Sequence, residues 1–274
     1  MLEKIEKVLV VIQETDKIES LLRQAIRLCE GHAAVMEILY IHQSPLFELP
    51  DYFKRSETEG LDSERVEKEI ETTLERLGNT SSYAIFIKES ETVDQVLALD
   101  KGEGQTCIIS FYHEEITPVL ARKVSSPLLV MKSEPKMYEQ ILFPVDLNEN
   151  NAAFIRDMKT LFPSASIKLL YEPSYIVENY IFDTDFAALP LDPAVDMELD
   201  QEMYEEQKEE FEALKKETGL PGELVNEFDM DFIEYINTQQ ADLLVLHSEN
   251  ANFLFEDTIS KELLSAIKTD LFIF

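Results

Sequence analysis

Near its start the chain carries the apolar run Val8-Leu9-Val10-Val11-Ile12, and near its middle it carries a similar run, Ile141-Leu142-Phe143-Pro144-Val145. Neither run alternates between apolar and polar residues, which is typical of a strand that is buried on both faces of a parallel sheet. Three more pairs of segments follow in the same order: Ile38–Ile41 and Ile167–Tyr171, Cys107–Ser110 and Leu243–Leu246, Pro127–Met131 and Asp270–Phe274. The chain therefore contains a tandem repeat of one α/β unit.

Helical segments separate these strands in both copies. After the first strand, apolar residues keep helical spacing from Ile18 to Cys29, and Asp16 with Glu19 resembles an N-cap with its capping-box partner. We expect this helix to end at Gly31, because glycine is the preferred residue after a helix C-terminus. Strands that alternate with helices predict right-handed crossovers and a parallel, doubly wound sheet.

The repeat predicts a chain of two tandem domains. We expect two flavodoxin-like α/β domains, each with a doubly wound, five-stranded parallel sheet, over residues 1–133 and 138–274. With 274 residues, the chain gives each half enough length for its own core. The linker Ser133–Lys136 is short, so the two domains should lie against each other as an internal pseudo-dimer.

The composition narrows the class of protein. An apolar share of 45% and a charged share of 29% are typical of a soluble globular chain. No apolar stretch approaches the roughly 20 residues of a membrane span, and the first residues lack the layout of a secretory signal. Cys29 and Cys107 are expected as small core residues, not as a disulfide or metal ligands. We therefore expect a cytoplasmic protein.

The net charge of −31 is uneven along the chain. Residues 1–137 hold 16 Lys and Arg against 25 Asp and Glu, whereas residues 138–274 hold 8 against 30. A negative field of this size repels nucleic acid, anionic membranes and nucleotide phosphates. Acidic surfaces that keep the protein in solution are the simplest interpretation.

Three local motifs resemble the universal stress protein family in its two-domain form, and the resemblance covers nearly the whole chain. Phe143-Pro144-Val145-Asp146 is similar to the end of the family's first strand, and Asp257–Leu264 is similar to the start of its last helix. The segment Val119–Val130 resembles the family's last helix and its Pro-Val-Leu-Val strand. The resemblance implies that Leu128–Met131 and Leu271–Phe274 pair in antiparallel orientation, because these proteins commonly pair through their last strands.

The glycine motif that wraps phosphates in nucleotide-binding members of this family is missing from both copies. The seven glycines lie outside both candidate loops: Gly31, Gly60, Gly78, Gly102, Gly104, Gly219 and Gly222. The first loop, Phe111–Ile116, is too short and carries two carboxylates. In the second copy, His247–Asn250 and Asp257 stand where the glycines would be. ATP binding of the family's usual kind is therefore disfavoured in both copies.

Only Asp146 and Thr258 match residues that contact nucleotide in the family. Asp146 is a candidate for a retained ligand contact, and the alternative is that it caps the helix that follows. Thr258 has the same two interpretations, with an N-cap favoured. The four histidines, His32, His42, His113 and His247, lack the spacing of metal ligands, and no motif indicates catalytic residues. We expect neither a metal site nor an enzyme.

Residues Pro173–Met197 form an apolar, proline-containing connection where the first copy has Pro45–Gly60. A long apolar connection is typical of a packed lid or of a contact surface. The simpler interpretation is that each segment covers the edge or upper end of its own sheet. The alternative is a pocket or a protein interface.

The residues and the resemblance together predict a non-enzymatic stress-response protein without a cofactor, which acts through a protein partner or a small ligand. One alternative is an adenine-nucleotide switch that binds ATP or AMP in the second domain only, with Asp146 at the base and Thr258 at the phosphates. A second alternative is a carrier of an apolar ligand, built on Pro173–Met197. Nucleic acid and membranes are not expected partners, and whether two chains also form a homodimer is left open.

Overall fold

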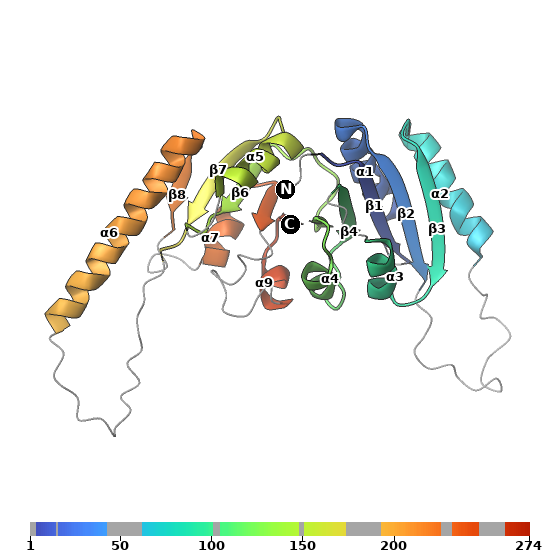
Figure 1. Ribbon diagram of the computed structural model, residues 1–274. Helices are drawn as coiled ribbons and strands as arrows, with labels where there is room; N and C mark the ends of the chain where they lie inside the picture. The colour runs from blue at the N-terminus through green and yellow to red at the C-terminus, as the bar shows by residue number, and fades with distance from the viewer. Residues whose placement is uncertain are drawn as a thin grey trace, which may run out of the picture.

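The computed structural model describes residues 4–14, 16–42, 62–100, 105–147, 151–173, 193–225, 232–246 and 261–274, without the side chains of 193–203 and Glu262. Within these ranges, strands and helices alternate along both halves of the chain, as the sequence predicted (Figure 1). The first half contains strands β1 (Lys7–Gln13), β2 (Val35–His42), β3 (Tyr83–Glu89), β4 (Thr106–Phe111) and β5 (Leu128–Met131). Its helices are α1 (Ile18–His32), α2 (Ser63–Leu77), α3 (Thr92–Leu99) and α4 (Thr117–Lys123).

The second half repeats this plan. Its strands are β6 (Gln140–Pro144), β7 (Ser166–Tyr171), β8 (Gly222–Leu224), β9 (Leu243–Leu246) and β10 (Asp270–Ile273). Its helices are α5 (Asn151–Leu161), α6 (Pro193–Thr218), α7 (Phe232–Thr238) and α9 (Lys261–Ala266). Part of the segment Pro173–Met197 therefore belongs to a helix, because α6 begins at Pro193.

A single ten-stranded sheet runs through both halves, in the order β3-β2-β1-β4-β5-β10-β9-β6-β7-β8. Each half contributes five parallel strands, and the two sets meet where β5 pairs with β10 in antiparallel orientation. In this register Leu271 faces Val130 and Ile273 faces Leu128. The expected pairing of the two last strands, and with it the internal pseudo-dimer, is confirmed. Figure 1 shows the two halves side by side, with both ends of the chain near the middle.

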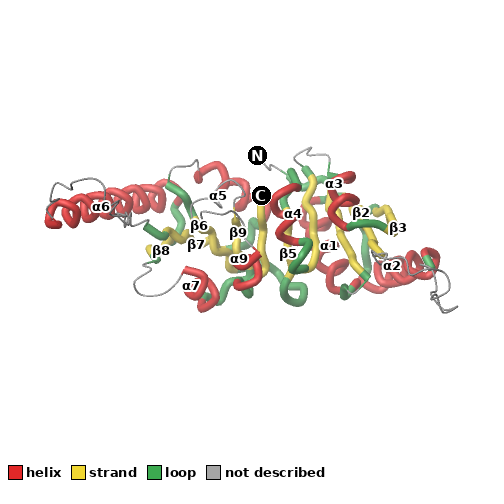
Figure 2. The backbone as a smooth tube through the Cα atoms, turned by 90° about the horizontal axis from the view of Figure 1, so that it is seen from below, coloured by secondary structure: helices red, strands yellow, loops and turns green. Residues whose placement is uncertain are grey.

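Helices lie on both sides of the sheet (Figure 2), and the sheet has an apolar core on each face. Along β1, Val8, Val10 and Ile12 belong to the core that also contains residues of α1 and α2. Leu9 and Val11 point into the other core, which contains residues of α3 and α4. An unbroken apolar run suits this position because successive side chains of a strand point to opposite faces.

Glycine ends α2 and α6 but not α1. Gly78 and Gly219 follow α2 and α6 in the left-handed conformation, with φ of 73° and 67°. In α1 that conformation falls on Ala33 (φ 53°), two residues after the predicted stop at Gly31. The N-terminus of α1 also differs, since the N-cap is Lys17 and no side chain caps the helix. The predicted cap at Asp16 is therefore wrong, because its carboxylate has other partners, described below.

Candidate functional site

The first half has a switch point between β1 and β4, where the strand order reverses. In open α/β sheets, ligands bind beyond the carboxyl ends of the strands next to such a point. Asp16 follows β1 by three residues, and His113 follows β4 by two. The topology therefore brings these two side chains, which are far apart in sequence, to the place where a ligand is expected.

Asp16 and His113 close this switch point by contacting each other. The His113 Nε2 atom lies 2.9 Å from Asp16 Oδ1, and only 4% of the Asp16 side chain is exposed. The other carboxylate oxygen, Oδ2, accepts a hydrogen bond of 2.7 Å from the backbone N–H of Gln13. His113 is held in place by its own N–H, which donates to Thr117 Oγ1 at 2.8 Å. Oδ2 of Asp16 is thus hydrogen-bonded within the protein, and Oδ1 lies against the His113 ring, whose Nε2 atom makes no hydrogen bond among the described residues.

A polar cavity of about 650 Å³ lies beside this pair, and its basic groups are paired with carboxylates. Arg23 and Arg76 both donate to Glu19, at 2.6 and 2.8 Å. The hydrogen bond from Arg23 is the largest of the causes that lower the pKa of the Glu19 carboxyl group. Lys17 donates to Glu134 at 2.6 Å. A phosphate group would have to displace these pairs, so the cavity is poorly suited to an anion.

The loop after β4 contacts the second half instead of forming a phosphate cradle. It runs from Tyr112 to Ile116, and its two carboxylates bind Lys261 at the start of α9, with Glu114 at 3.0 Å and Glu115 at 2.7 Å. These pairs are exposed, so they add little to stability. They do add negative charge beyond the carboxyl end of β4.

The second half has the corresponding switch point between β6 and β9. Asp146 lies there, two residues after β6, and is partly buried. Its backbone carbonyl accepts a hydrogen bond from the side-chain amide of Asn151, the first residue of α5. Burial, with a smaller contribution from the Asp146 carboxylate, raises the pKa of Tyr171 to about 12. Thr258 lies outside the described residues, so the predicted pair of Asp146 and Thr258 stays a prediction, as does the role of 174–192.

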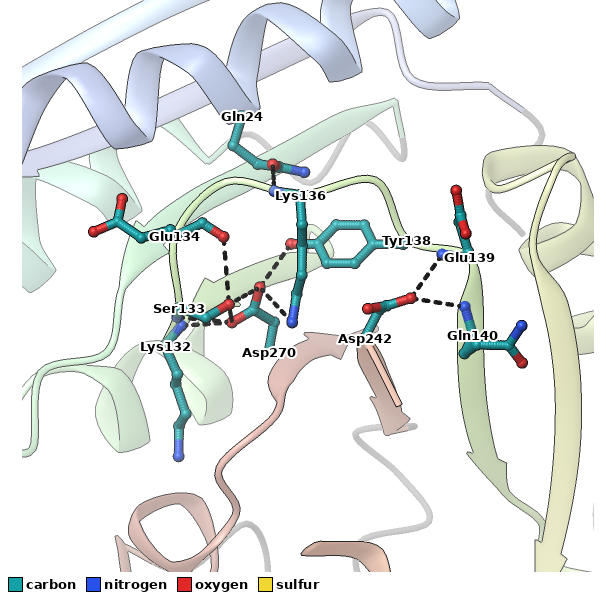
Figure 3. A network of polar contacts seen from close by, with 10 residues as sticks. All are labelled: Gln24, Lys132, Ser133, Glu134, Lys136, Tyr138, Glu139, Gln140, Asp242 and Asp270. Carbon is teal, nitrogen blue, oxygen red and sulfur yellow. Dashed lines mark hydrogen bonds and ion pairs between the residues drawn. The ribbon is translucent and has the colours of Figure 1, made fainter. Parts of the chain in front are cut away.

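A buried carboxylate fastens the linker between the halves. Asp270, the first residue of β10, is 0% exposed, and its Oδ1 accepts from the backbone N–H groups of Lys132 and Ser133 at 2.7 and 3.0 Å (Figure 3). The Tyr138 hydroxyl donates to Oδ2 at 3.2 Å, and the Lys136 Nζ atom lies 3.9 Å from it. Because buried charge is costly without partners, these contacts fix the path of the linker.

The described ranges contain neither a cluster of metal ligands nor a helix suited to a membrane. No group of three or more His, Cys, Asp or Glu residues there is arranged to hold a metal ion. None of the described helices combines the length and the apolar character that crossing a membrane requires. Cys29 and Cys107 are free and buried, as predicted, and burial raises the pKa of each thiol to about 12.

Comparisons with known proteins identify the fold. No family model matches the chain, and no curated protein matches it in sequence. Among solved structures, a protein assigned as a universal stress protein from Pseudomonas aeruginosa UCBPP-PA14 is similar over 100% of this chain and 94% of its own, with a TM-score of 0.63 and 15% identity. A universal stress protein from Archaeoglobus fulgidus DSM 4304 covers 97% and 95%, with a TM-score of 0.54 and 12% identity. The chain has the universal stress protein fold.

A third solved structure, of a protein of unknown function from Pseudomonas aeruginosa PAO1, is similar over 100% of this chain and 93% of its own, with a TM-score of 0.64 and 17% identity. All three similarities therefore extend over both halves. They match the tandem universal stress protein fold that the sequence predicted, and they carry no information about individual site residues at these identities.

Within this universal stress protein fold, sequence reasoning missed the contact between Asp16 and His113. A signal was available, because both residues follow strands that lie beside the switch point. Asp16 had been assigned to a helix cap, and His113 had been judged only by its lack of metal-ligand spacing. The hydrogen bonds of Asp270 left no signal of this kind, because a carboxylate at the start of a strand is ordinary in a chain this acidic.

Proposed function

We propose that this chain is a member of the universal stress protein family and serves as a non-enzymatic stress-response protein that acts through a protein partner or a small ligand. In this proposal, ATP binding of the family's usual kind is lost. The two domains comprise residues 1–133 and 138–274, and the protein works in the cytoplasm. The observation that carries the proposal is the contact between Asp16 and His113, which occupies the switch point of the first half.

The charge around this point supports the same proposal. A nucleotide phosphate needs free N–H donors or cations, often at a glycine-rich turn. Arg23, Arg76 and Lys17 are the basic residues that line the neighbouring cavity, and each is bound to a carboxylate. Glu114 and Glu115 add negative charge in the loop that would hold the phosphates.

The second candidate function is an adenine-nucleotide switch that uses the second half alone. It is favoured by the position of Asp146, which lies partly buried beyond the carboxyl end of β6 at the second switch point. In this alternative Asp146 binds the base and Thr258 the phosphates. The strongly acidic composition of residues 138–274 weighs against it.

Direct binding measurements on the full chain distinguish the two proposed functions. Native mass spectrometry of the freshly purified protein should find no bound nucleotide, and calorimetric titration with ATP or AMP, with and without magnesium, should give no binding heat. A bound nucleotide mass would restore the switch. So would heat that Asp146→Ala abolishes and Asp62→Ala leaves unchanged. Asp62 is a suitable control because it caps the exposed start of α2, away from both switch points.

A further inference from the structure

A second cavity, of about 210 Å³, lies where the two halves and the linker meet. Its walls come from the second half of α1, from the linker at Lys136–Tyr138, and from the turn Leu161–Ser164 after α5. The helices run antiparallel to the strands, so this cavity lies at the amino ends of the strands, away from both switch points. Figure 3 shows Lys136 next to Gln24 of α1, whose side-chain oxygen accepts from the Lys136 N–H at 3.1 Å, and Tyr138 beside it pointing toward Asp270.

The charge of this cavity is opposite to that of the chain. Arg27, the neutral His32 ring and Lys136, whose Nζ atom lies 3.9 Å from the Asp270 carboxylate, line it, and none of its lining residues is Asp or Glu, so Arg27 supplies its unpaired positive charge. The Arg27 Nη1 atom is covered from solvent and has no hydrogen-bond partner among the described residues. A guanidinium N–H that is shielded and unpaired is unfavourable, and a carboxylate is the group that satisfies it best. This differs from the cavity beside Asp16, where every basic group is paired.

The pKa of His32, which lines the same cavity, depends on the charge around it. Burial lowers the pKa of its imidazole, a hydrogen bond with the backbone of Leu161 opposes this, and Lys4 lowers it further. The ring is therefore neutral at pH 7, and an anion brought into the cavity would raise its pKa. Lys4 also adds to the positive surroundings of this end of α1.

The other walls are apolar. Leu28, Met137, Phe162 and Tyr138 contribute hydrocarbon surface, and the rings of Tyr138 and Phe162 meet edge to face with their centroids 5.8 Å apart. The volume corresponds to about seven water molecules at liquid density, which suits a small molecule rather than a peptide. Met137 remains 62% exposed although it borders the cavity, so the cavity has an open side through which a ligand can enter.

We propose that this cavity binds a small organic carboxylate whose body is aromatic or branched aliphatic. The carboxylate would accept from the Arg27 Nη1 atom and lie close to Lys136, and the body would pack against Phe162 and Leu28. Binding there joins α1 of the first half to α5 of the second half through the linker. The site rests on its own residues and is independent of nucleotide binding.

Sodium benzoate is the probe that tests this proposal on the full chain. The protein is labelled with ¹³C in its methionine methyl groups, and the Met137 resonance is assigned from the Met137→Leu variant. Benzoate should shift the Met137 resonance in a saturable way at constant ionic strength. Benzamide, which has the ring without the charge, and inorganic phosphate, which has the charge without the ring, should each bind at least about tenfold more weakly.

A matched pair of variants locates the charge. Arg27→Gln should weaken benzoate binding by about tenfold or more, because it removes the charged donor and keeps an unbranched, polar side chain that suits a helix. Arg23→Gln lies one turn earlier on the same helix, is exposed and pairs with Glu19, so it should leave the affinity unchanged. In the wild type, bound benzoate should also raise the pKa of His32, measured from its ring protons.

Several outcomes overturn the proposal: no saturable shift of Met137, equal binding of benzamide or phosphate, or equal affinity in Arg27→Gln and the wild type. If Arg27→Gln does not fold, the comparison of the three probes on the wild-type protein decides. The nucleotide titration and the benzoate titration give separate results, so the proposed function and this site can fail independently.

Discussion

At the scale of single residues, Asp16 shows that the same sequence pattern can belong either to a helix N-cap or to a contact beyond the end of a strand. The pattern of Asp16 followed by Glu19 is typical of a capped helix, yet α1 has no side-chain cap. Asp16 instead turns toward the sheet, where it accepts from the Gln13 N–H and contacts His113. The local pattern loses because a carboxylate that is almost fully buried needs a hydrogen bond, and Asp16 obtains it from the Gln13 N–H instead of from the first turn of α1.

Replacing Asp16 should therefore cost more stability than replacing an exposed neighbour. Asp16→Ala removes the carboxylate that accepts from the Gln13 N–H and contacts the His113 ring, and we expect the free energy of unfolding to fall by about 2 kcal/mol. The control is Glu14→Ala, because Glu14 contacts His42 at 2.8 Å but its side chain is 56% exposed, so the loss should stay within about 1 kcal/mol. Urea unfolding followed by far-ultraviolet circular dichroism measures both. Equal losses would show that the contact at the switch point is not stabilising.

At the scale of elements, the sequence predicted what depends on local patterns. The unbroken apolar runs located β1, β4, β5 and β9, and the glycines after α2 and α6 marked the ends of these helices. The first and last residues of helices and strands were predicted less well where tertiary contacts, not local patterns, determine them. The edge strand β8 covers only Gly222–Leu224, and the repeated apolar segments of the sequence did not include it. Asp146 was placed correctly at the end of a strand, but its chemical role depends on neighbours that no local pattern specifies.

Lys132 connects two elements at the junction of the halves. It follows β5, and its ammonium group donates to the backbone carbonyls of Leu264 and Ile267 near the end of α9. It also lies over the ring of Tyr112, 4.3 Å from the centroid. Burial lowers the pKa of Lys132 from 10.5 to about 8, and the carboxylate of Asp270 opposes this shift. The ammonium group of Lys132 is thus partly removed from solvent where β5 meets α9.

The lowered pKa of Lys132 predicts that this side chain makes the free energy of unfolding depend on pH. Between pH 8 and 10.5 the unfolded chain keeps the proton on Lys132 and the folded chain loses it, so Lys132 favours folding increasingly as the pH rises. The full shift corresponds to roughly 3 kcal/mol, and partial solvent access reduces this to about 1–2 kcal/mol. Relative to Lys132→Met, the wild type should therefore gain this amount across the window.

Urea unfolding at pH values on both sides of the window measures this gain. Lys123→Met is the control, because Lys123 is exposed in the last turn of α4 and should show no such trend against the wild type. A difference between wild type and Lys132→Met that stays constant with pH would contradict the prediction.

At the scale of the whole molecule, the two halves share one sheet, and several kinds of contact hold them together. The strands β5 and β10 pair along the seam, and all four residues of each are buried. Asp270 fastens the linker above them, and aromatic rings of the second half, Phe162 and Phe272, pack edge to face with centroids 5.5 Å apart. The proposed carboxylate site lies at the same junction, so a ligand there would bear on both halves at once.

The seam predicts how the first half behaves alone. A chain of residues 1–133 would expose the edge of β5, where Leu128–Met131 carries unpaired backbone groups beside buried apolar side chains. An open edge of this kind is a template for another strand, so we expect two copies to pair through β5 in antiparallel orientation, as β5 and β10 do in the full chain. Light scattering after size-exclusion chromatography should give twice the mass of the fragment, while circular dichroism keeps its α/β form. A folded monomer would show that the seam does not need a partner strand. An unfolded fragment would show that residues 1–133 are not an independent domain, and that the core of the first half depends on contacts across the seam.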